Sequence, residues 1–247
     1  MFAIFGKELR SLFLSPLAWS LLIAMQLVLA WIFLVQLEQF LQLQPKLAGL
    51  ESAPGVSTLV IAPLLDSAAM TLMLLVPLLT MGMFSRDSGS GTLDLLFSSP
   101  ISLTAIVMGK YFAVLTFLAI TLVLIALMPL SLLLGTRPDM GSLAAALLAL
   151  TLAGTAYAAV GIWISSMTKQ PAVAAVLTYA VLLLLWIINL TDNEGTDSLL
   201  QQLSLSSHFQ RMLSGLVTSS DIIYFLLLIL IGLILCIHRL ERLRIEG

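Results

Sequence analysis

This sequence has unusually few charged residues. Only 10% of its 247 residues are Asp, Glu, Lys or Arg and 60% are hydrophobic, whereas a soluble domain carries about 25% charged residues. A chain of this composition cannot cover its surface with polar groups, so we expect an integral membrane protein. The net charge of −2 provides no basic surface, which argues against nucleic acid as a partner.

Cysteine and histidine are also scarce. The single cysteine, Cys236, excludes an intrachain disulfide and a multi-cysteine metal site. The two histidines, His208 and His238, lie far apart in the sequence and have no metal-ligand spacing. We therefore expect no metal site in this chain.

The motifs of an energy source and of a hydrolase are missing as well. A P-loop needs G-x-x-x-x-G-K-[ST], and the Gly-Lys pairs at positions 6–7 and 109–110 are followed by neither Ser nor Thr. Ser90 stands between two glycines, but it lies in a segment predicted to be flexible and solvated, with His208 predicted on the opposite side of the membrane. Because no predicted span carries an ionisable residue near its centre, ion-coupled transport is not expected. No catalytic residue and no cofactor are expected in this chain.

What the chain does have is long apolar runs. A bilayer core needs about 20 helical residues, and six segments approach or exceed that length, at 17–37, 64–84, 103–134, 143–167, 172–190 and 222–238. The third is longer than a crossing needs, so its first turns, up to Lys110, are expected in the headgroup region, with Pro129 bending its far end. No ten-residue alternating strand pattern is present. The predicted fold class is therefore an all-α membrane protein with six transmembrane helices in a single domain over 1–247.

The basic residues predict how the six helices are oriented. Eight fall on one side of the predicted arrangement and three on the other, which accounts for all eleven. Cytoplasmic loops carry the excess of Lys and Arg, so both termini are expected in the cytoplasm. The eight are Lys7, Arg10, Arg86, Lys110, Lys169, Arg239, Arg242 and Arg244.

Residues 2–16 do not fit a crossing. At 100° per residue, Phe2, Phe5, Leu9 and other apolar side chains cluster on one face, which predicts an amphipathic helix on the cytoplasmic membrane surface. The alternative is a plain extension of the first span, and Ser15-Pro16 argues against it by interrupting the chain.

Residues 86–100 form a second segment outside the spans. A Ser/Gly stretch over 85–90, predicted to be flexible, leads into Gly91-Thr92-Leu93-Asp94-Leu95-Leu96-Phe97, and Ser98-Ser99-Pro100 ends it. Ser90 or Gly91 could cap a two-turn helix with Asp94 at its positive end. So short an apolar helix has little reason to form alone, so we expect it to dock into a partner. The alternative is a loop that dips into the lipid.

A third segment, 191–221, lies on the outer side in this arrangement. It begins polar and becomes semi-apolar after Leu199, too broken by Gln, Ser and Arg211 to span. Short re-entrant or interfacial helices are expected there.

These segments carry a family resemblance. Pro77-Leu78-Leu79-Thr80-Met81, then Gly91-Thr92-Leu93-Asp94-Leu95-Leu96, Ser99-Pro100 and Gly109-Lys110, occur in the order typical of type-2 ABC transporter permeases, followed by Gly161–Thr168 and Leu205-Ser206-Ser207-His208-Phe209. Within that family the chain most resembles the compact permeases described as gliding-motility-associated. Two departures concern the contact with the ATPase: the segment before the coupling helix keeps Asp87 but few other charges, and Gly82 stands where a basic residue is common.

The resemblance implies a function and partners. It implies a permease subunit, an exporter in the bacterial inner membrane, that pairs with a second copy as a homodimer in lipid. Each copy would rest on a separate ABC ATPase subunit, which binds the ATP and Mg²⁺. The implied ATPase-coupling interface comprises Lys7, Glu8, Arg10, Asp87, Gly91, Thr92, Leu93, Asp94, Leu96, Ser99 and Pro100. The implied outer gate segment comprises Leu205, His208, Phe209 and Gly215.

Two alternatives stay open from the sequence. One is an ATP-driven assembly that passes conformational work to a periplasmic partner with little solute flux. The other is a membrane scaffold that transports nothing and binds no ATPase. The absence of buried charge favours a lipidic, amphipathic or polymeric cargo over a small ion.

Overall fold

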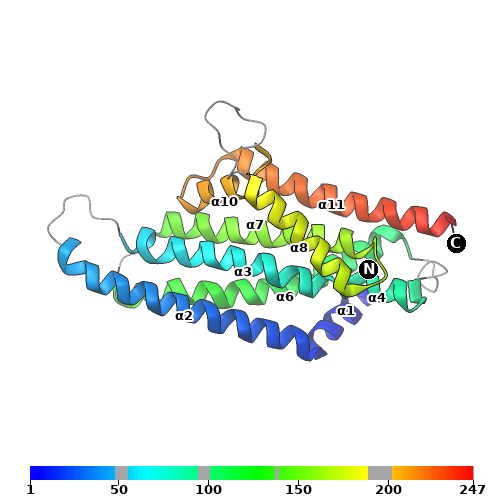
Figure 1. The fold of residues 1–247 in the computed structure, drawn as a ribbon, viewed down its shortest axis with the longest axis horizontal. Helices are drawn as coiled ribbons and strands as arrows, with labels where there is room; N and C mark the ends of the chain where they lie inside the picture. The colour runs from blue at the N-terminus through cyan, green and yellow to red at the C-terminus, as the bar shows by residue number, and fades with distance from the viewer. Residues whose placement is uncertain (48–54, 94–100, 137–138, 189–201, 247) are drawn as a thin grey trace.

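The computed structural model describes residues 1–47, 55–93, 101–136, 139–188 and 202–246, and every regular element there is helical (Figure 1). The longer helices lie side by side along the bundle, and shorter ones cover its ends. The α-helices are α1 (Phe2–Leu14), α2 (Pro16–Leu47), α3 (Ala62–Thr80), α4 (Gly82–Gly89), α6 (Leu103–Ser131), α7 (Met140–Ser165), α8 (Pro171–Ile187), α10 (Leu205–Leu213) and α11 (Ser219–Glu246). A π-helical turn, Ser57–Ile61, precedes α3, and a 3-10 turn, Leu132–Leu134, follows α6.

Five helical runs among the described residues are long and apolar enough to cross a membrane. They are Pro16–Pro45, Ser57–Gly89, Leu103–Leu134, Met140–Ser165 and Ser219–Ile245. The segment predicted at 172–190 is α8, which is equally apolar but covers 17 residues. The protein is therefore an all-helical, multi-pass membrane protein, and the sixth crossing stays a prediction.

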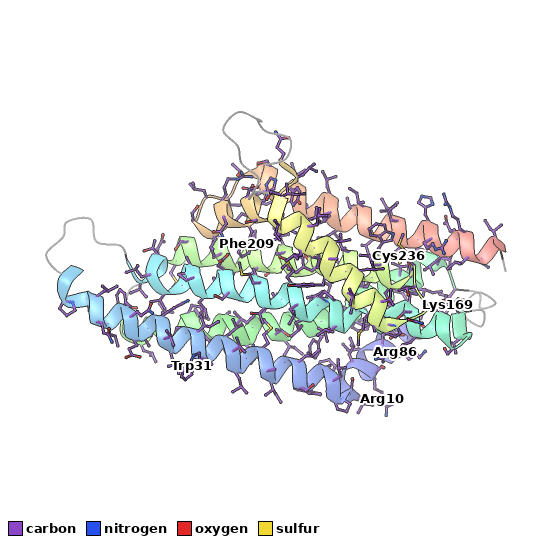
Figure 2. The ribbon with its side chains drawn as sticks, in the orientation of Figure 1. Arg10, Trp31, Arg86, Lys169, Phe209 and Cys236 are labelled. Carbon is purple, nitrogen blue, oxygen red and sulfur yellow. The ribbon has the colours of Figure 1, made fainter. Side chains whose placement is uncertain are left out.

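Helix α7 forms the centre of the bundle. It contacts α3, α6, α8, α10 and α11, and 67% of its most apolar stretch is buried, against 22% for α2. Its many Ala and Gly residues let neighbouring backbones approach closely. A Cβ on Gly161 would lie 2.1 Å from Thr80 Oγ1 of α3, and one on Gly232 of α11 would lie 3.0 Å from the Ala159 carbonyl carbon. Helix α2 instead exposes large apolar side chains such as Trp31 (Figure 2), as a lipid-facing helix does.

The break predicted at Ser15-Pro16 is present. Ser15 has extended backbone angles (φ −77°, ψ 119°), and α1 and α2 are separate helices. The Trp19 indole N–H donates to the Phe13 carbonyl across the break (2.7 Å). Helix α1 packs on α6, where Gly109 leaves room for Ile4, 3.2 Å from where its Cβ would be. That α1 lies on the membrane surface stays a prediction.

The two ends of the bundle differ in their charged residues. Both termini and α4 lie at one end, and α10 lies toward the other (Figure 1). Arg10, Arg86 and Lys169, which come from three separate predicted cytoplasmic segments, all lie at the end that holds the termini (Figure 2). We call this end the basic end.

Candidate coupling interface

The second spanning run breaks at the junction between α3 and α4. Helix α3 ends at Thr80, and α4 begins at Gly82. The Ser165 hydroxyl, from the end of α7, lies at this break: it accepts from the Phe84 N–H (3.1 Å) and the Ser85 N–H (3.2 Å) and donates to the Met81 carbonyl (2.8 Å). A side chain inserted into a helical ladder produces such a break.

This observation corrects the prediction for residues 85–90. The Ser/Gly stretch was expected to be flexible, but residues up to Gly89 are helical, and Ser85 is fully buried. Helix α4 packs on α7 and α8, and Gly89 has no room for a Cβ because the Lys169 carbonyl would lie 2.9 Å away. Small residues serve close packing here.

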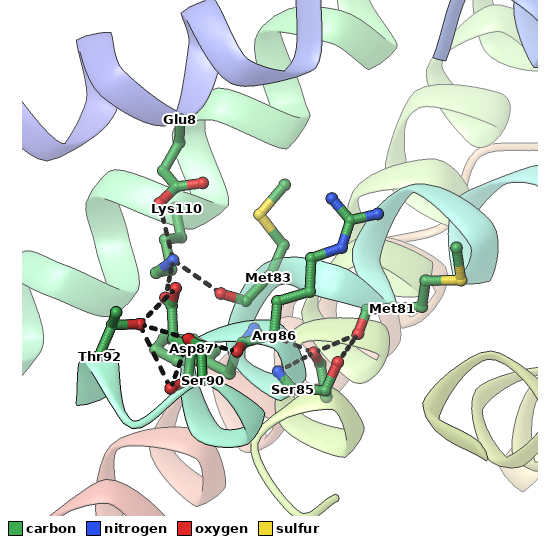
Figure 3. A network of polar contacts seen from close by, with 11 residues as sticks. Glu8, Met81, Met83, Ser85, Arg86, Asp87, Ser90, Thr92 and Lys110 are labelled. Atoms are coloured by element: carbon green, nitrogen blue, oxygen red, sulfur yellow. Dashed lines mark hydrogen bonds and ion pairs between the residues drawn. The ribbon is translucent and has the colours of Figure 1, made fainter. Parts of the chain in front are cut away.

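Lys110 is the centre of a buried polar cluster beside this junction (Figure 3). Its side chain is 2% exposed, and its Nζ lies 2.8 Å from Glu8 Oε1 of α1 and 2.8 Å from Asp87 Oδ2 of α4. The ammonium also donates to the Met83 carbonyl (2.7 Å) and lies 5.1 Å from the centre of the Phe84 ring. All three N–H donors of the ammonium therefore have acceptors, which offsets the cost of burying the charge.

The cluster ties together three elements that are far apart in the sequence. Lys110 comes from α6, Glu8 from α1 and Asp87 from α4. Breaking a buried ion pair leaves an uncompensated charge and costs about 3–5 kcal/mol. The three helices α1, α4 and α6 are therefore held to one another by ion pairs whose loss is costly. We call these residues the Lys110 cluster.

The chain after α4 turns at a glycine. Gly91 has φ +70°, a left-handed conformation that suits glycine at a helix end. The Thr92 hydroxyl reaches back to the Asp87 carbonyl (3.3 Å) and lies 2.9 Å from the Ser90 hydroxyl. Helical backbone resumes at Thr92, and Leu93 is 7% exposed.

The predicted coupling residues therefore divide into four groups. Lys7 and Arg10 are exposed on α1, and Arg10 lies at the basic end (Figure 2). Glu8 and Asp87 face Lys110, and Asp87 belongs to α4. Gly91, Thr92 and Leu93 form the turn after α4. Asp94, Leu96, Ser99 and Pro100 lie outside the described residues.

The predicted outer gate segment folds into α10. Leu205 and Phe209 are fully buried, and His208 is 4% exposed. Gly215, with φ +87°, turns the chain just beyond the end of α10. Helix α10 packs on α7, α8, α3 and α11, and Gln210 donates to Asp66 of α3 (2.7 Å). The first part of the predicted outer-side segment, residues 191–201, lies outside the described residues.

A second polar cluster joins α10 to the start of α11. His208 Nδ1 lies 2.7 Å from Asp221 Oδ1, and the Arg211 guanidinium donates to the same oxygen from Nε (3.1 Å) and Nη2 (2.7 Å). The second carboxylate oxygen accepts from Thr218 at the start of α11. The His208 ring also stacks on Tyr224, with centroids 4.2 Å apart. We call these residues the outer polar cluster.

Two residues central to these sites were not among the predicted site residues. Lys110 was expected in the headgroup region, which stays a prediction; its burial inside the protein was not foreseen, and a lone lysine within an apolar run was the signal that could have found it. Ser165 offered no such signal, because serine near a helix end is ordinary. Within the described residues, no group of three His, Cys, Asp or Glu side chains is placed to hold a metal ion.

A comparison with known protein families identifies the family of this chain. Residues 2–243 match the family described as ABC-2 family transporter protein. Since the match covers nearly the whole chain, this protein belongs to that family and is a type-2 ABC transporter permease, the transmembrane subunit of an ABC transporter. Permeases of this family typically work with an ABC ATPase subunit. A search of curated proteins found no match to the chain.

Proposed function

We propose that this permease is an exporter in the bacterial inner membrane, with both termini in the cytoplasm. It works as a homodimer, and each copy receives the motion of a separate ATPase subunit at the basic end. The Lys110 cluster is the observation that supports this proposal most directly. It connects α1 and α4, the two elements next to the proposed ATPase contact, to the spanning helix α6.

The charges at the basic end support the orientation. Lys7, Arg10, Arg86 and Lys169 come from four positions in the sequence, and loops on the cytoplasmic side carry such an excess. The basic end is then the end that an ATPase in the cytoplasm can reach.

The connections among the helices support transmission as a rigid body. The Lys110 cluster joins α1, α4 and α6, and Ser165 joins the α3–α4 junction to α7. Closure of two ATPase subunits would therefore move the inner ends of several spanning helices together, as in domain closure by hinge and shear.

Export of an amphipathic, lipidic or polymeric cargo suits the interior better than ion transport. Lys110, the buried cation at the basic end, is fully occupied by its own partners. In the outer polar cluster, toward the other end, the Asp221 carboxylate is likewise paired with His208 and Arg211. Neither cluster leaves a free carboxylate to carry an ion.

The test combines capture of the ATPase with its activity. A tagged permease expressed with its neighbouring genes should capture a P-loop ATPase, and the complex should hydrolyse ATP faster than the ATPase alone. Leu93→Asp and Leu96→Asp should abolish that stimulation and leave insertion into the membrane intact. Leu134→Asp adds the same charge at an exposed leucine beyond α6 and should leave stimulation unchanged. Because Leu93 is itself buried, the unfolding midpoint of each variant is measured too, and loss of stimulation counts only where the midpoint is kept.

The outcomes separate this proposal from its alternatives. Absence of any captured ATPase would mean a scaffold. Unchanged stimulation in both variants would remove the coupling role from residues 86–100. Stimulated hydrolysis in vesicles without movement of lipid or drug probes would favour mechanical work on a periplasmic partner.

A further inference from the structure

A cavity lies at the basic end, next to the Lys110 cluster. It occupies about 150 Å³ between α1, the start of α2 and the α3–α4 junction, several times the roughly 30 Å³ that one water molecule takes up in the liquid. Its polar lining includes Lys7, Ser11, Ser15 and Arg86. Leucines of α1, α2 and α3 supply most of its apolar lining.

The acids of this cavity are already engaged, whereas two of its bases are not. Glu8 and Asp87 also line it, and each lies 2.8 Å from Lys110 Nζ. Neither Lys7 nor Arg86 forms an ion pair within the part of the chain that the structure describes. The cavity therefore offers two uncommitted cations to an anion.

Uncommitted hydroxyls accompany these cations. The side chains of Ser11 and Ser15 make no hydrogen bond to any described residue. An arginine fork, an ammonium and two hydroxyls together supply the several donors that the oxygens of a phosphate accept.

The path of Arg86 shows that the backbone makes room for its guanidinium. The side chain runs back along α4 across Gly82, where an added Cβ would lie 2.6 Å from Arg86 Nε and 3.0 Å from its Cζ. Figure 3 shows the guanidinium pointing away from the Lys110 cluster, with no partner drawn. The absence of a side chain at Gly82 thus leaves room for the Arg86 guanidinium beside the cavity, which both residues line.

We propose that this cavity binds the phosphate headgroup of an anionic phospholipid. The inference rests on the proposed orientation, which places the basic end at the cytoplasmic leaflet. There, basic pockets between helices attract anionic headgroups. The leucine lining and the exposed Leu17 and Trp19 at the start of α2 provide an apolar surface for the acyl chains. Free phosphate would leave that surface without a ligand.

The test is lipid binding by the purified full chain in neutral detergent, followed by native mass spectrometry. Phosphatidylglycerol should bind, and phosphatidylcholine should bind more weakly. Since one basic residue near an anionic headgroup is worth a factor of about five, Arg86→Gln should weaken phosphatidylglycerol binding about fivefold. Gly82→Ala should weaken it too, because it displaces the guanidinium. Arg242→Gln removes an exposed arginine of α11 that does not line the cavity, so it should have no effect.

Four results would overturn the proposal. Equal binding of the two lipids would remove the role of charge, and equal weakening by Arg86→Gln and Arg242→Gln would show diffuse attraction. Displacement of phosphatidylglycerol by millimolar inorganic phosphate would show that a soluble anion is the ligand. Loss of ATPase capture in Arg86→Gln with lipid binding unchanged would assign the cavity to the protein interface. ATPase capture by the unsubstituted chain is measured separately, so failure of the proposed function is recognised independently of lipid binding.

Discussion

Removing the ammonium of Lys110 should destabilise the permease. In Lys110→Met the carboxylates of Glu8 and Asp87 lose the cation that lies 2.8 Å from each. Breaking a buried ion pair costs about 3–5 kcal/mol. The two carboxylate side chains are still 14% and 20% exposed, so water screens them in part and the lower end, about 3 kcal/mol, is expected.

The assay is thermal unfolding of the purified chain in detergent, with Lys169→Met as the matched control. For a chain of this size, 1 kcal/mol shifts the midpoint by about 2–4 °C, so Lys110→Met should lower it by about 6–12 °C. Lys169 is exposed at the same end, and its replacement should have little effect. Adding Glu8→Gln and Asp87→Asn to Lys110→Met removes the orphaned charges and should recover at least half of the loss.

Two results would refute the reasoning about this cluster. If Lys110→Met and Lys169→Met shift the midpoint equally, the buried ion pairs do not hold the helices together. If the triple variant is no more stable than Lys110→Met, the loss comes from packing around the lysine chain and not from unpaired charge.

Three further substitutions test close packing, the outer polar cluster and the turn after α4, each by the unfolding midpoint in detergent. Gly161→Ala places a Cβ 2.1 Å from Thr80 Oγ1 and should cost about 1–3 kcal/mol by overpacking. The control, Gly6→Ala, has open space around the new Cβ and should be neutral or stabilising. Equal unfolding midpoints for the two variants would contradict the close contact between α7 and α3. Asp221→Ala removes the fully buried carboxylate of the outer polar cluster and should cost about 3 kcal/mol, whereas a loss below that of an ordinary surface change would show that the cluster is not structural. Gly91→Ala should cost about 1–2 kcal/mol because φ is +70°, and Gly91→Asn should cost less, since asparagine tolerates that conformation; the reverse order would contradict a left-handed turn.

The helical class and the break between α1 and α2 could be predicted from the sequence, because both depend on residues close together in the chain. The scarcity of charge and the long apolar runs predicted a helical membrane protein, because a lipid-exposed backbone must satisfy its own hydrogen bonds. The break between α1 and α2 followed from Ser15-Pro16, since proline restricts the residue before it. The order of the family motifs was equally local, and the match over residues 2–243 agrees with it.

The stretch at 85–90 shows where local reasoning was wrong. Serine and glycine favour turns when the chain is considered alone, yet here they are helical up to Gly89. Their small side chains allow α4 to pack closely on α7 and α8. The Ser165 hydroxyl accepts hydrogen bonds from two backbone N–H groups at the break. Packing against distant segments outweighed local preference.

The sequence by itself, through its scarce charge and its long apolar runs, determined that the chain resides in a membrane and that its helices are long and apolar. Only the tertiary structure decided what the few charges do. The structure brings Glu8 and Asp87 to Lys110 from separate helices. It also brings Asp221 to His208. Arg86, in contrast, has no ion-pair partner among the described residues and lies beside a cavity. The physical reason is that burial strongly favours pairing a charge, while the choice of partner depends on which helix ends the packing of α7 and its neighbours brings together.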